Sequence, residues 1–261
     1  MTAPVHVIVQ ARGGSNRLPA KVLEDIGGKP ALLWCLDRCQ HIEGAYVVVA
    51  VSEAPDSDAV ADLAWQAGYK VVRGSDHDVL SRTAKAARDT GAEFVMRVTS
   101  DCPLIDPRIC NHVIETFFRH KADYACNNMP PSWPHGLDCE LMPASLLHQA
   151  DAVAQEGYER EHVTPWIRRH ADLNRVNFTG PGGMLARLRW TLDYGDDLRF
   201  FRALVEAMGP ARAEYARAAE LASLCLRRPD ILGINAHKVD LDRLAQALRP
   251  TFATRPCKLA A

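Results

Sequence analysis

The sequence has no apolar run long enough to cross a membrane. A spanning helix needs about 20 consecutive apolar residues, and no run in the 261 residues approaches that length. The first residues, MTAPVHVIVQARGG, carry neither the basic segment nor the cleavage site of a secretion signal. We therefore expect a cytoplasmic protein that does not act on a membrane.

The chain also lacks an excess of charge of either sign. Its 31 basic and 32 acidic residues leave a net charge of −1. No overall positive field would then attract a nucleic-acid polymer, so we expect no such partner. A small anionic ligand needs only a local group of cations, and the composition does not exclude it.

Cysteine motifs of metal sites are missing as well. None of the eight cysteines forms a CxxC pair, which argues against a structural zinc site. Cys35 and Cys39 lie one helical turn apart, and we expect both to face the core as thiols. There is no internal repeat and no low-complexity linker. We expect one domain over residues 1–250 and a disordered tail over 251–261.

What the sequence does contain is a regular alternation of strand and helix patterns. Apolar, largely β-branched runs predict buried strands near 7–9, 45–51, 70–72 and 93–99, an extended piece near 122–128 and further strands near 137–142 and 188–192. Amphipathic segments predict helices near 30–39, 59–67, 79–90, 108–121, 144–156, 160–169 and 198–208. The predicted fold class is α/β, with a mostly parallel central sheet flanked by helices in three αβα layers.

Polar loops follow three of the predicted strands. They cover residues 12–21, 73–78 and 100–106. In an open α/β sheet, ligands bind in a crevice outside the carboxyl ends of the strands. We therefore expect these loops to converge on one site.

The first loop carries the strongest signal for an anion. Arg12, Arg17 and Lys21 place three cations within ten residues, and Gly13 and Gly14 would let backbone N–H groups turn inward. The loop is neither GxxxxGK[ST] nor a clean GxGxxG, so by itself it is weak evidence. Our hypothesis is a triphosphate-binding loop.

Two aspartates would complete such a site. Asp101 directly follows the strand predicted at 93–99, and Asp193 follows the one predicted at 188–192. One or two carboxylates together with phosphate oxygens commonly hold Mg²⁺ on a nucleotide. Alternatively, either aspartate could merely cap a turn or the next helix.

Seven stretches extend the pattern over nearly the whole chain. In order they are QARGGSNRLPAKVL, RGSDHDVLSR, RVTSDCPLIDP, HGLDCELM, EREHVTPWI, LRWTLDYGDDL and RRPDILGIN. Together they resemble the cytidylyltransferases that make CMP-activated sugars. The likeness is greatest to the branch named for spore-coat polysaccharide synthesis, with relatives that activate acylneuraminate and 3-deoxy-manno-octulosonate. The resemblance implies a Rossmann-like nucleotidyltransferase fold and CTP-dependent transfer of CMP with release of pyrophosphate.

The resemblance also implies roles for individual residues. The catalytic residues would be Arg12, Lys21, Asp101 and Asp193, and the two aspartates would bind Mg²⁺ as the cofactor. The nucleotide-binding residues would be Ala11, Gly13, Gly14, Ser15, Arg17, Arg73, Ser75, Asp78, Arg82 and Ser100. The acceptor would be bound from a middle segment, about residues 122–182, by His135, Asp138, Glu140, Arg160, Glu161 and His162.

The implied partners are CTP, a small-molecule acceptor and a second copy of the chain. The acceptor would offer an oxygen of a sugar acid, an amino sugar or a phosphonate-type molecule, and the homodimer would pair through the middle segment. His135 stands where the family usually has aspartate, and Ser100 where it usually has glycine. The acceptor can therefore differ from that of the branch named above.

Alternatives remain open from the sequence. The enzyme could use another nucleoside triphosphate, because phosphate loops do not read bases, or the chain could bind nucleotides without catalysis on the same fold. The segment 159–162 could be a solvated helix start whose acids complement the helix dipole. His162 could be a base for the acceptor hydroxyl or a core or capping group.

Overall fold

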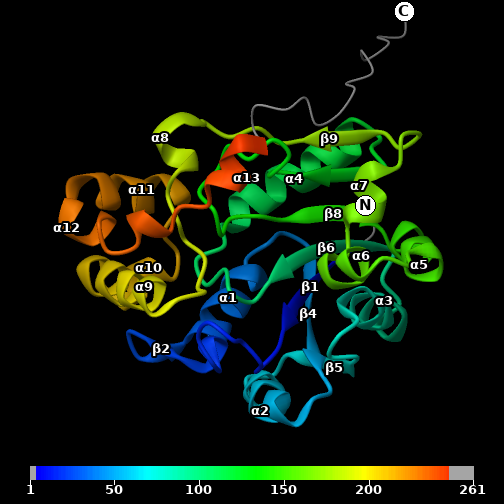
Figure 1. Cartoon of the computed structure of the whole chain (residues 1–261), viewed down its shortest axis with the longest axis horizontal. Coiled ribbons are helices and arrows are strands. Elements are labelled where there is room, and N and C mark those ends of the chain that lie inside the picture. Colours follow the sequence, from blue (N-terminus) through cyan, green and yellow to red (C-terminus); the bar gives the residue numbers. More distant parts are fainter. Residues whose placement is uncertain (1–3, 247–261) are drawn as a thin grey trace, which may run out of the picture.

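A seven-stranded sheet organises residues 4–246, the part of the chain that the computed structural model describes (Figure 1). The tail expected at 251–261 lies outside that range. The strand order is β5-β4-β1-β6-β8-β7-β9. The bounds are β1 Val5–Ala11, β4 Ala45–Ser52, β5 Lys70–Gly74, β6 Phe94–Thr99, β7 Tyr124–Cys126, β8 Glu140–Pro143 and β9 Arg175–Asn177. Only β8 among these strands runs antiparallel to its neighbours.

Strand β1 lies in the interior of the sheet because its sequence suits burial on both faces. All seven of its residues are buried, and it pairs in parallel with β4 and β6. Val7 and Val9 point into one core and Ile8 into another, as the alternation of side chains along a strand requires. The carboxyl ends of β1, β4, β5 and β6 therefore share one edge of the sheet.

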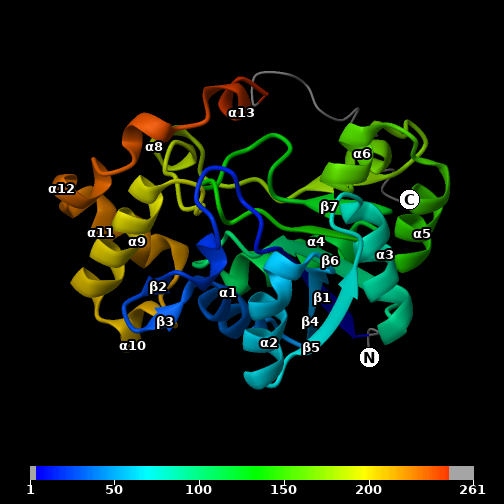
Figure 2. The same cartoon turned by 60° about the horizontal axis from the view of Figure 1, so that its bottom comes forward.

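Helices cover both faces and one side of the sheet (Figures 1 and 2). Their bounds are α1 Ala31–Gln40, α2 Asp58–Gln66, α3 Val79–Thr90, α4 Pro107–Arg119, α5 Ala144–Val153, α6 Gly157–His162, α7 Pro165–Arg169, α8 Gly183–Ala186, α9 Gly195–Met208, α10 Pro210–Ala213, α11 Ala218–Arg227, α12 Pro229–Leu232 and α13 Leu241–Gln246. Short 3₁₀ helices occur at η1 Lys21–Leu23, η2 Pro55–Ser57 and η3 Ala236–Lys238.

Three hydrophobic clusters correspond to these layers. Helices α1, α2 and α4 pack on one face of the sheet, and α3, α5 and α7 pack on the other. Helices α9 to α12 gather beside the sheet, where they bury Trp34 and Trp190 with the small hairpin of β2 (Asp25–Ile26) and β3 (Lys29–Pro30). This third cluster brings the segment around residue 193 up to the sheet edge.

The structure differs from the sequence-based elements in the second half of the chain. The segment 188–192, predicted as a strand, forms only an isolated bridge between Arg189 and His135, because its apolar residues pack into the third cluster. The helix predicted at 160–169 is two helices, α6 and α7. Pro165 has no N–H to continue α6, and Val163 between the two helices has φ +71°.

The cysteines agree with the prediction where they are described. Cys35 and Cys39 are fully buried in the first cluster, and the seven cysteines within residues 4–246 are all buried free thiols. None of the helices in that range is long and apolar enough to span a membrane.

Candidate active site

A cavity of about 470 Å³ opens at the carboxyl edge of the sheet. Its wall comes from the ends of β1 and β6, the loop after β1, and helices α3 and α6. The charged residues that line it are Arg12, Arg17, Lys21, Arg82, Arg97, Asp101, Glu161 and Asp193. Five cations thus face three carboxylates, and this excess of positive charge favours a polyanionic ligand.

The loop after β1 is fixed at its first glycine. The N–H of Gly13 donates to Ser57 Oγ at 2.8 Å, and a Cβ at position 13 would lie 1.9 Å from the carbonyl oxygen of Asp56. Glycine is therefore required here because the loop packs tightly against the segment after β4. The N–H that we expected to turn towards an anion is already used, whereas Gly14, Ser15 and Ala11 line the cavity.

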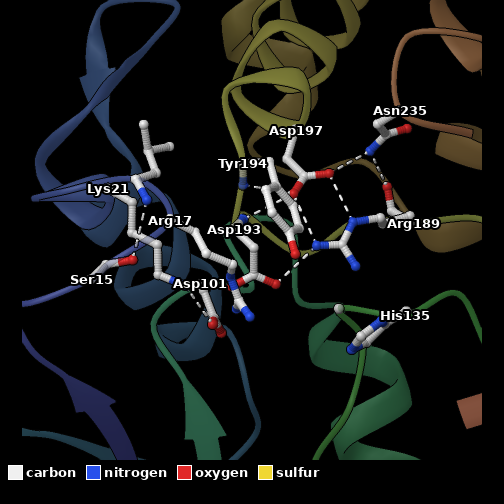
Figure 3. A network of polar contacts seen from close by, with 12 residues as sticks. Ser15, Arg17, Lys21, Asp101, His135, Arg189, Asp193, Tyr194, Asp197 and Asn235 are labelled. Atoms are coloured by element: carbon white, nitrogen blue, oxygen red, sulfur yellow. Dashed lines mark hydrogen bonds and ion pairs between the residues drawn. The ribbon is translucent and has the colours of Figure 1, made fainter. Parts of the chain in front are cut away.

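Lys21 lies between the two predicted metal ligands (Figure 3). Its Nζ is 2.9 Å from Asp101 Oδ2 and 2.8 Å from Asp193 Oδ1. Arg17 Nη2 also reaches Asp193 Oδ1, at 2.6 Å. The N–H of Leu192 donates to the Asp101 carbonyl at 2.8 Å, which ties the two aspartate segments together. We call Arg17, Lys21, Asp101 and Asp193 the loop cluster.

Both aspartates are held in the ionised form. Burial alone would raise the pKa of Asp101, but the Lys21 ammonium and a hydrogen bond with Thr99 together lower that pKa below its usual value. Burial would likewise raise the pKa of Asp193, but Lys21 and Arg17 hold that pKa well below its usual value. Burial opposes the charge of Lys21, yet the two carboxylates raise its pKa. At neutral pH the loop cluster therefore holds full charges.

Asp193 does not cap helix α9. The carboxylate of Asp197 takes that role, because it accepts hydrogen bonds from the N–H groups of Asp193 at 2.9 Å and Tyr194 at 3.0 Å. The side chain of Asp193 is thereby left to face the cavity. The capping alternative from the sequence does not apply to it.

A buried arginine supports Asp193 from the side opposite Lys21 (Figure 3). Arg189 Nη2 is 2.9 Å from Asp193 Oδ2, and Arg189 Nε is 2.9 Å from Asp197 Oδ1. Asn235 donates to both the Arg189 carbonyl and Asp197 Oδ1 at 2.9 Å. We did not single out these residues from the sequence, although the spacing of Arg189, Asp193 and Asp197 at four-residue intervals was a usable signal.

A second charged group lies behind the cavity and reaches its lining only through Arg97. Glu140 Oε2 is 2.6 Å from Arg97 Nη1, and Arg97 Nε donates to Gln10 Oε1 at 3.1 Å. The other oxygen, Glu140 Oε1, accepts from Thr164 Oγ1 at 2.8 Å and also contacts Tyr124 and Arg168. The back-wall cluster is Arg97, Tyr124, Glu140, Thr164 and Arg168.

Glu140 is buried and holds neighbouring side chains in place, whereas the family resemblance implied that it binds the acceptor. Its side chain is 1% exposed and does not line the cavity. Burial would raise its pKa, but Arg168 and Arg97 lower it to about 2. What reaches the cavity is Arg97, held in place by this carboxylate. Arg97 and Gln10 were not among the predicted site residues.

The loop after β5 contributes less to the cavity than expected. Arg73 pairs with Asp58 at 2.8 Å, and the Ser75 hydroxyl accepts from the N–H of Asp78 at 3.1 Å. Asp78 caps α3 by accepting from Ser81 N at 2.9 Å. No residue of the loop 73–78 lines the cavity; only Val79 and Arg82 of the following helix α3 do. The buried guanidinium of Arg82 contacts the Ser75 carbonyl, and its Nε has no hydrogen-bond partner within residues 4–246.

Two of the six predicted acceptor-binding residues reach the cavity, namely Glu161 and His162. Arg160 instead joins α6 to Asp78 and Asp151 through ion pairs. Asp138 pairs with Arg243 at 2.8 Å, and His135 lies 4.0 Å from Asp138 outside the cavity lining.

A tight turn at Val163 lies between His162, which lines the cavity, and Thr164, which binds Glu140. Val163 has φ +71° and ψ −55°, and the N–H of Thr164 donates to the His162 carbonyl at 2.8 Å, which defines a rare, strained γ-turn. The turn directs His162 to the cavity and Thr164 to Glu140. Burial lowers the pKa of His162, and Glu161 opposes this in part. Its surroundings therefore favour the neutral imidazole of His162, which can accept a proton.

Asp101 and Asp193 could bind a metal ion only together with oxygens supplied by a bound phosphate ligand. Within residues 4–246 there is no group of three or more His, Cys, Asp and Glu side chains that could hold an ion. Asp101 and Asp193 nevertheless turn carboxylate oxygens towards one cation, the Lys21 ammonium. Two carboxylates with phosphate oxygens are a sufficient set for Mg²⁺.

An α/β sheet with a cationic loop and two aspartates at its carboxyl edge is suited to binding a polyphosphate together with a divalent cation. A family model described as cytidylyltransferase matches residues 6–193, which is most of the chain. The chain belongs to the cytidylyltransferase family, whose members transfer CMP from CTP. The enzyme class and the fold predicted from the sequence are thereby confirmed.

Individual relatives agree over most of their length. The spore coat polysaccharide biosynthesis protein SpsF of Bacillus subtilis is 32% identical over 231 residues, which cover 85% of this chain and 94% of that protein. The 3-deoxy-manno-octulosonate cytidylyltransferase of Rhizobium leguminosarum is 29% identical over 78% of this chain and 84% of its own length. A solved cytidylyltransferase from Leptospira borgpetersenii superposes with a TM-score of 0.83 at 26% identity, covering 88% of this chain and 97% of that one.

Proposed function

We propose that this cytidylyltransferase transfers CMP from CTP to an oxygen of a small acceptor and releases pyrophosphate. The observation that carries the proposal is the convergence of Lys21, Asp101 and Asp193 at one end of a cavity with an excess of cations. Each group has the charge that such a reaction needs. An acceptor oxygen would attack the α-phosphorus in line with the departing pyrophosphate.

The triphosphate would lie over the loop of residues 12–21. Arg12 lines the cavity and forms no ion pair with any described residue, so its charge is available. Arg17 and Lys21 would add two further cations. These groups would stabilise the negative charge that develops on the leaving pyrophosphate, and the protein would contribute mainly position and electrostatics.

Asp101 and Asp193 would hold the Mg²⁺ that accompanies the nucleotide. The fit rests on their ionised state and on the common point towards which their oxygens turn. When bound, such an ion withdraws charge from the phosphate oxygens and makes the α-phosphorus easier to attack. Arg189 would keep the Asp193 carboxylate oriented, since it contacts the oxygen that Lys21 does not use.

We propose a sugar acid, an amino sugar or a phosphonate-type molecule as the acceptor. The resemblance supports this range, as do the names of the relatives, one tied to polysaccharide biosynthesis and one to 3-deoxy-manno-octulosonate. His162, neutral and next to the cavity, would take the proton of the attacking oxygen.

We also propose a homodimer that pairs through residues 122–182, which light scattering on a gel-filtration column would test.

Pyrophosphate release measured with CTP, UTP, ATP and GTP against a library of acceptors tests the function. We expect release with CTP and one class of acceptor, and its loss in Asp101→Asn. Release with a different nucleotide and none with CTP would contradict the choice of base. No release with any nucleotide and a broad acceptor pool would favour a binding protein without catalysis.

A further inference from the structure

The loop cluster leaves Asp193 without a free carboxylate oxygen. Oδ1 is shared by Lys21 at 2.8 Å and Arg17 at 2.6 Å, and Oδ2 contacts Arg189 at 2.9 Å. Asp101 Oδ2 is in contact with Lys21 as well. A divalent cation held by both aspartates would therefore have to replace some of these contacts.

The three cations around Asp193 differ in how easily they can move away. The side chain of Arg17 is 54% exposed, and its head group contacts no carboxylate other than Asp193 within residues 4–246. Lys21 has a flexible four-carbon stem. The side chain of Arg189, by contrast, is only 6% exposed and is also bound to Asp197. Arg17 and Lys21 are thus exchangeable partners, and Arg189 is a permanent one.

A bare divalent cation would find this site unfavourable. It would approach two carboxylates whose charges Lys21 and Arg17 already balance, and like charges a few ångströms apart repel strongly where water is partly excluded. A triphosphate changes this balance, because its anionic oxygens can take over Lys21 and Arg17 as partners. The aspartates are then released when the nucleotide arrives.

We propose that Lys21 and Arg17 change partners, from the aspartates to the triphosphate, and that this exchange makes metal binding and nucleotide binding depend on each other. Lys21 then has two functions. Without nucleotide it balances the aspartates and disfavours a metal ion, and with nucleotide it binds phosphate. The inference deepens the proposed function and rests on its assignment of a triphosphate and a metal ion to this site.

The proposal predicts effects of opposite sign for one substitution. Removing the charge of Lys21 should strengthen the binding of metal alone, because the competing cation is lost. The same change should weaken the binding of nucleotide alone, because a phosphate partner is lost. A lysine that only stabilised the fold would weaken both, so the pair of measurements separates the two roles.

The experiment is calorimetric titration of Lys21→Met with Mn²⁺ alone and, separately, with CTP in EDTA. We expect Mn²⁺ to bind roughly tenfold more tightly than to the wild type, and CTP roughly tenfold more weakly, which is a usual size for coupling between sites. The matched control is Lys29→Met. Lys29 also bridges two carboxylates, Asp37 at 2.8 Å and Glu214 at 3.1 Å, but does not line the cavity, so both affinities should stay at the wild-type value.

A second variant protects the test against misfolding. Arg17→Met alters an exposed side chain, and it should shift both affinities in the same directions by a smaller factor. Circular dichroism would verify the fold of each variant. If folded Lys21→Met and Arg17→Met bind Mn²⁺ no more tightly than the wild type, the exchange is refuted. The Mn²⁺ titration contains neither nucleotide nor acceptor, so its result is independent of whether CTP is the donor.

Discussion

Two charged clusters lie at the same cavity and are built in opposite ways: the loop cluster lines it, whereas the back-wall cluster reaches it only through Arg97. In the loop cluster the cations come from a surface loop, and Arg17 is more than half exposed. In the back-wall cluster the carboxylate of Glu140 is 1% exposed and both its oxygens are bound by other side chains. Water or a ligand can therefore take the place of the exposed Arg17 at Asp193, whereas the Glu140 carboxylate has almost no contact with solvent. Charge near a cavity therefore indicates ligand binding only where the partners can be exchanged.

The strongest way to break this comparison is to remove the central carboxylate of the back wall. Glu140→Gln leaves the half-buried guanidinium groups of Arg97 and Arg168 beside a neutral amide. Breaking a buried ion pair in this way costs about 3–5 kcal/mol of stability. We expect a loss of that size in urea unfolding.

Glu161→Gln is the matched control, because Glu161 lines the same cavity but is exposed. Its unfolding free energy should stay within about 0.5 kcal/mol of the wild type, as for most surface substitutions. Equal stability of the two variants would show that the back wall is no more structural than the loop cluster.

Asp101→Asn makes the corresponding change in the loop cluster. Loss of a charge that acts in the transition state lowers turnover by about 10²–10³-fold. The ion pair with Lys21 is partly open to solvent, so the unfolding free energy should change by less than about 1 kcal/mol. Single-turnover pyrophosphate release and urea unfolding measure the two effects. Release at the wild-type rate would rule out the proposed role of Asp101.

The pH dependence of the unfolding free energy tests whether the buried Glu140 of the back-wall cluster is ionised. The pKa of Glu140 falls from 4.5 to about 2 on folding, so its ionisation stabilises the fold above pH 4.5. That contribution is lost as the pH drops from 4.5 towards 2. The stability gap between the wild type and Glu140→Gln should narrow over this interval and stay constant from pH 5 to 7. A gap that does not change with pH would contradict the ionised carboxylate.

The smallest effect is expected from Arg12, the cation of the loop that forms no ion pair with another residue of the described range 4–246. Arg12→Ala should raise the KM for CTP by at least roughly tenfold, since a charge-assisted hydrogen bond contributes about 1.5–3 kcal/mol. Its melting temperature should match that of the wild type. Arg73→Ala is the comparison, because Arg73 was predicted to bind the nucleotide but pairs with Asp58 away from the cavity lining. An equal rise in KM for both variants would show that the cavity lining does not define the nucleotide site.

The sequence predicted the first half of the fold well, because local patterns determine it. Apolar runs mark β1, β4 and β6, and Asp78 and Gly91 mark the two ends of α3. The positions of Asp101 and Asp193 also followed from local information, since Asp101 comes just after a strand and Asp193 after an apolar segment, while Lys21 ends the polar loop predicted at 12–21. Because ligands bind outside the carboxyl ends of the strands in such a sheet, the loops could then be predicted to share one site.

The remaining differences concern partners that lie far apart in the sequence. Nothing local to Glu140 shows that its carboxylate is bound by Arg97 and Arg168, at separations of 43 and 28 residues. Conversely, the apolar residues of 188–192 indicate burial but not whether they pair in a sheet or pack on helices. Burial can be predicted from periodicity, whereas the choice of partner requires the assembled fold.

Asn235 has a consequence for the order in which the enzyme becomes competent during synthesis. Its side chain fastens Arg189 and Asp197, the two groups that orient Asp193, yet it lies 42 positions beyond the last residue matched by the family model. A nascent chain that has just left the ribosome up to residue 193 would already carry every loop of the cavity. It would still lack the amide that steadies the second aspartate. Catalytic competence would therefore arrive late in translation, after the sheet has formed.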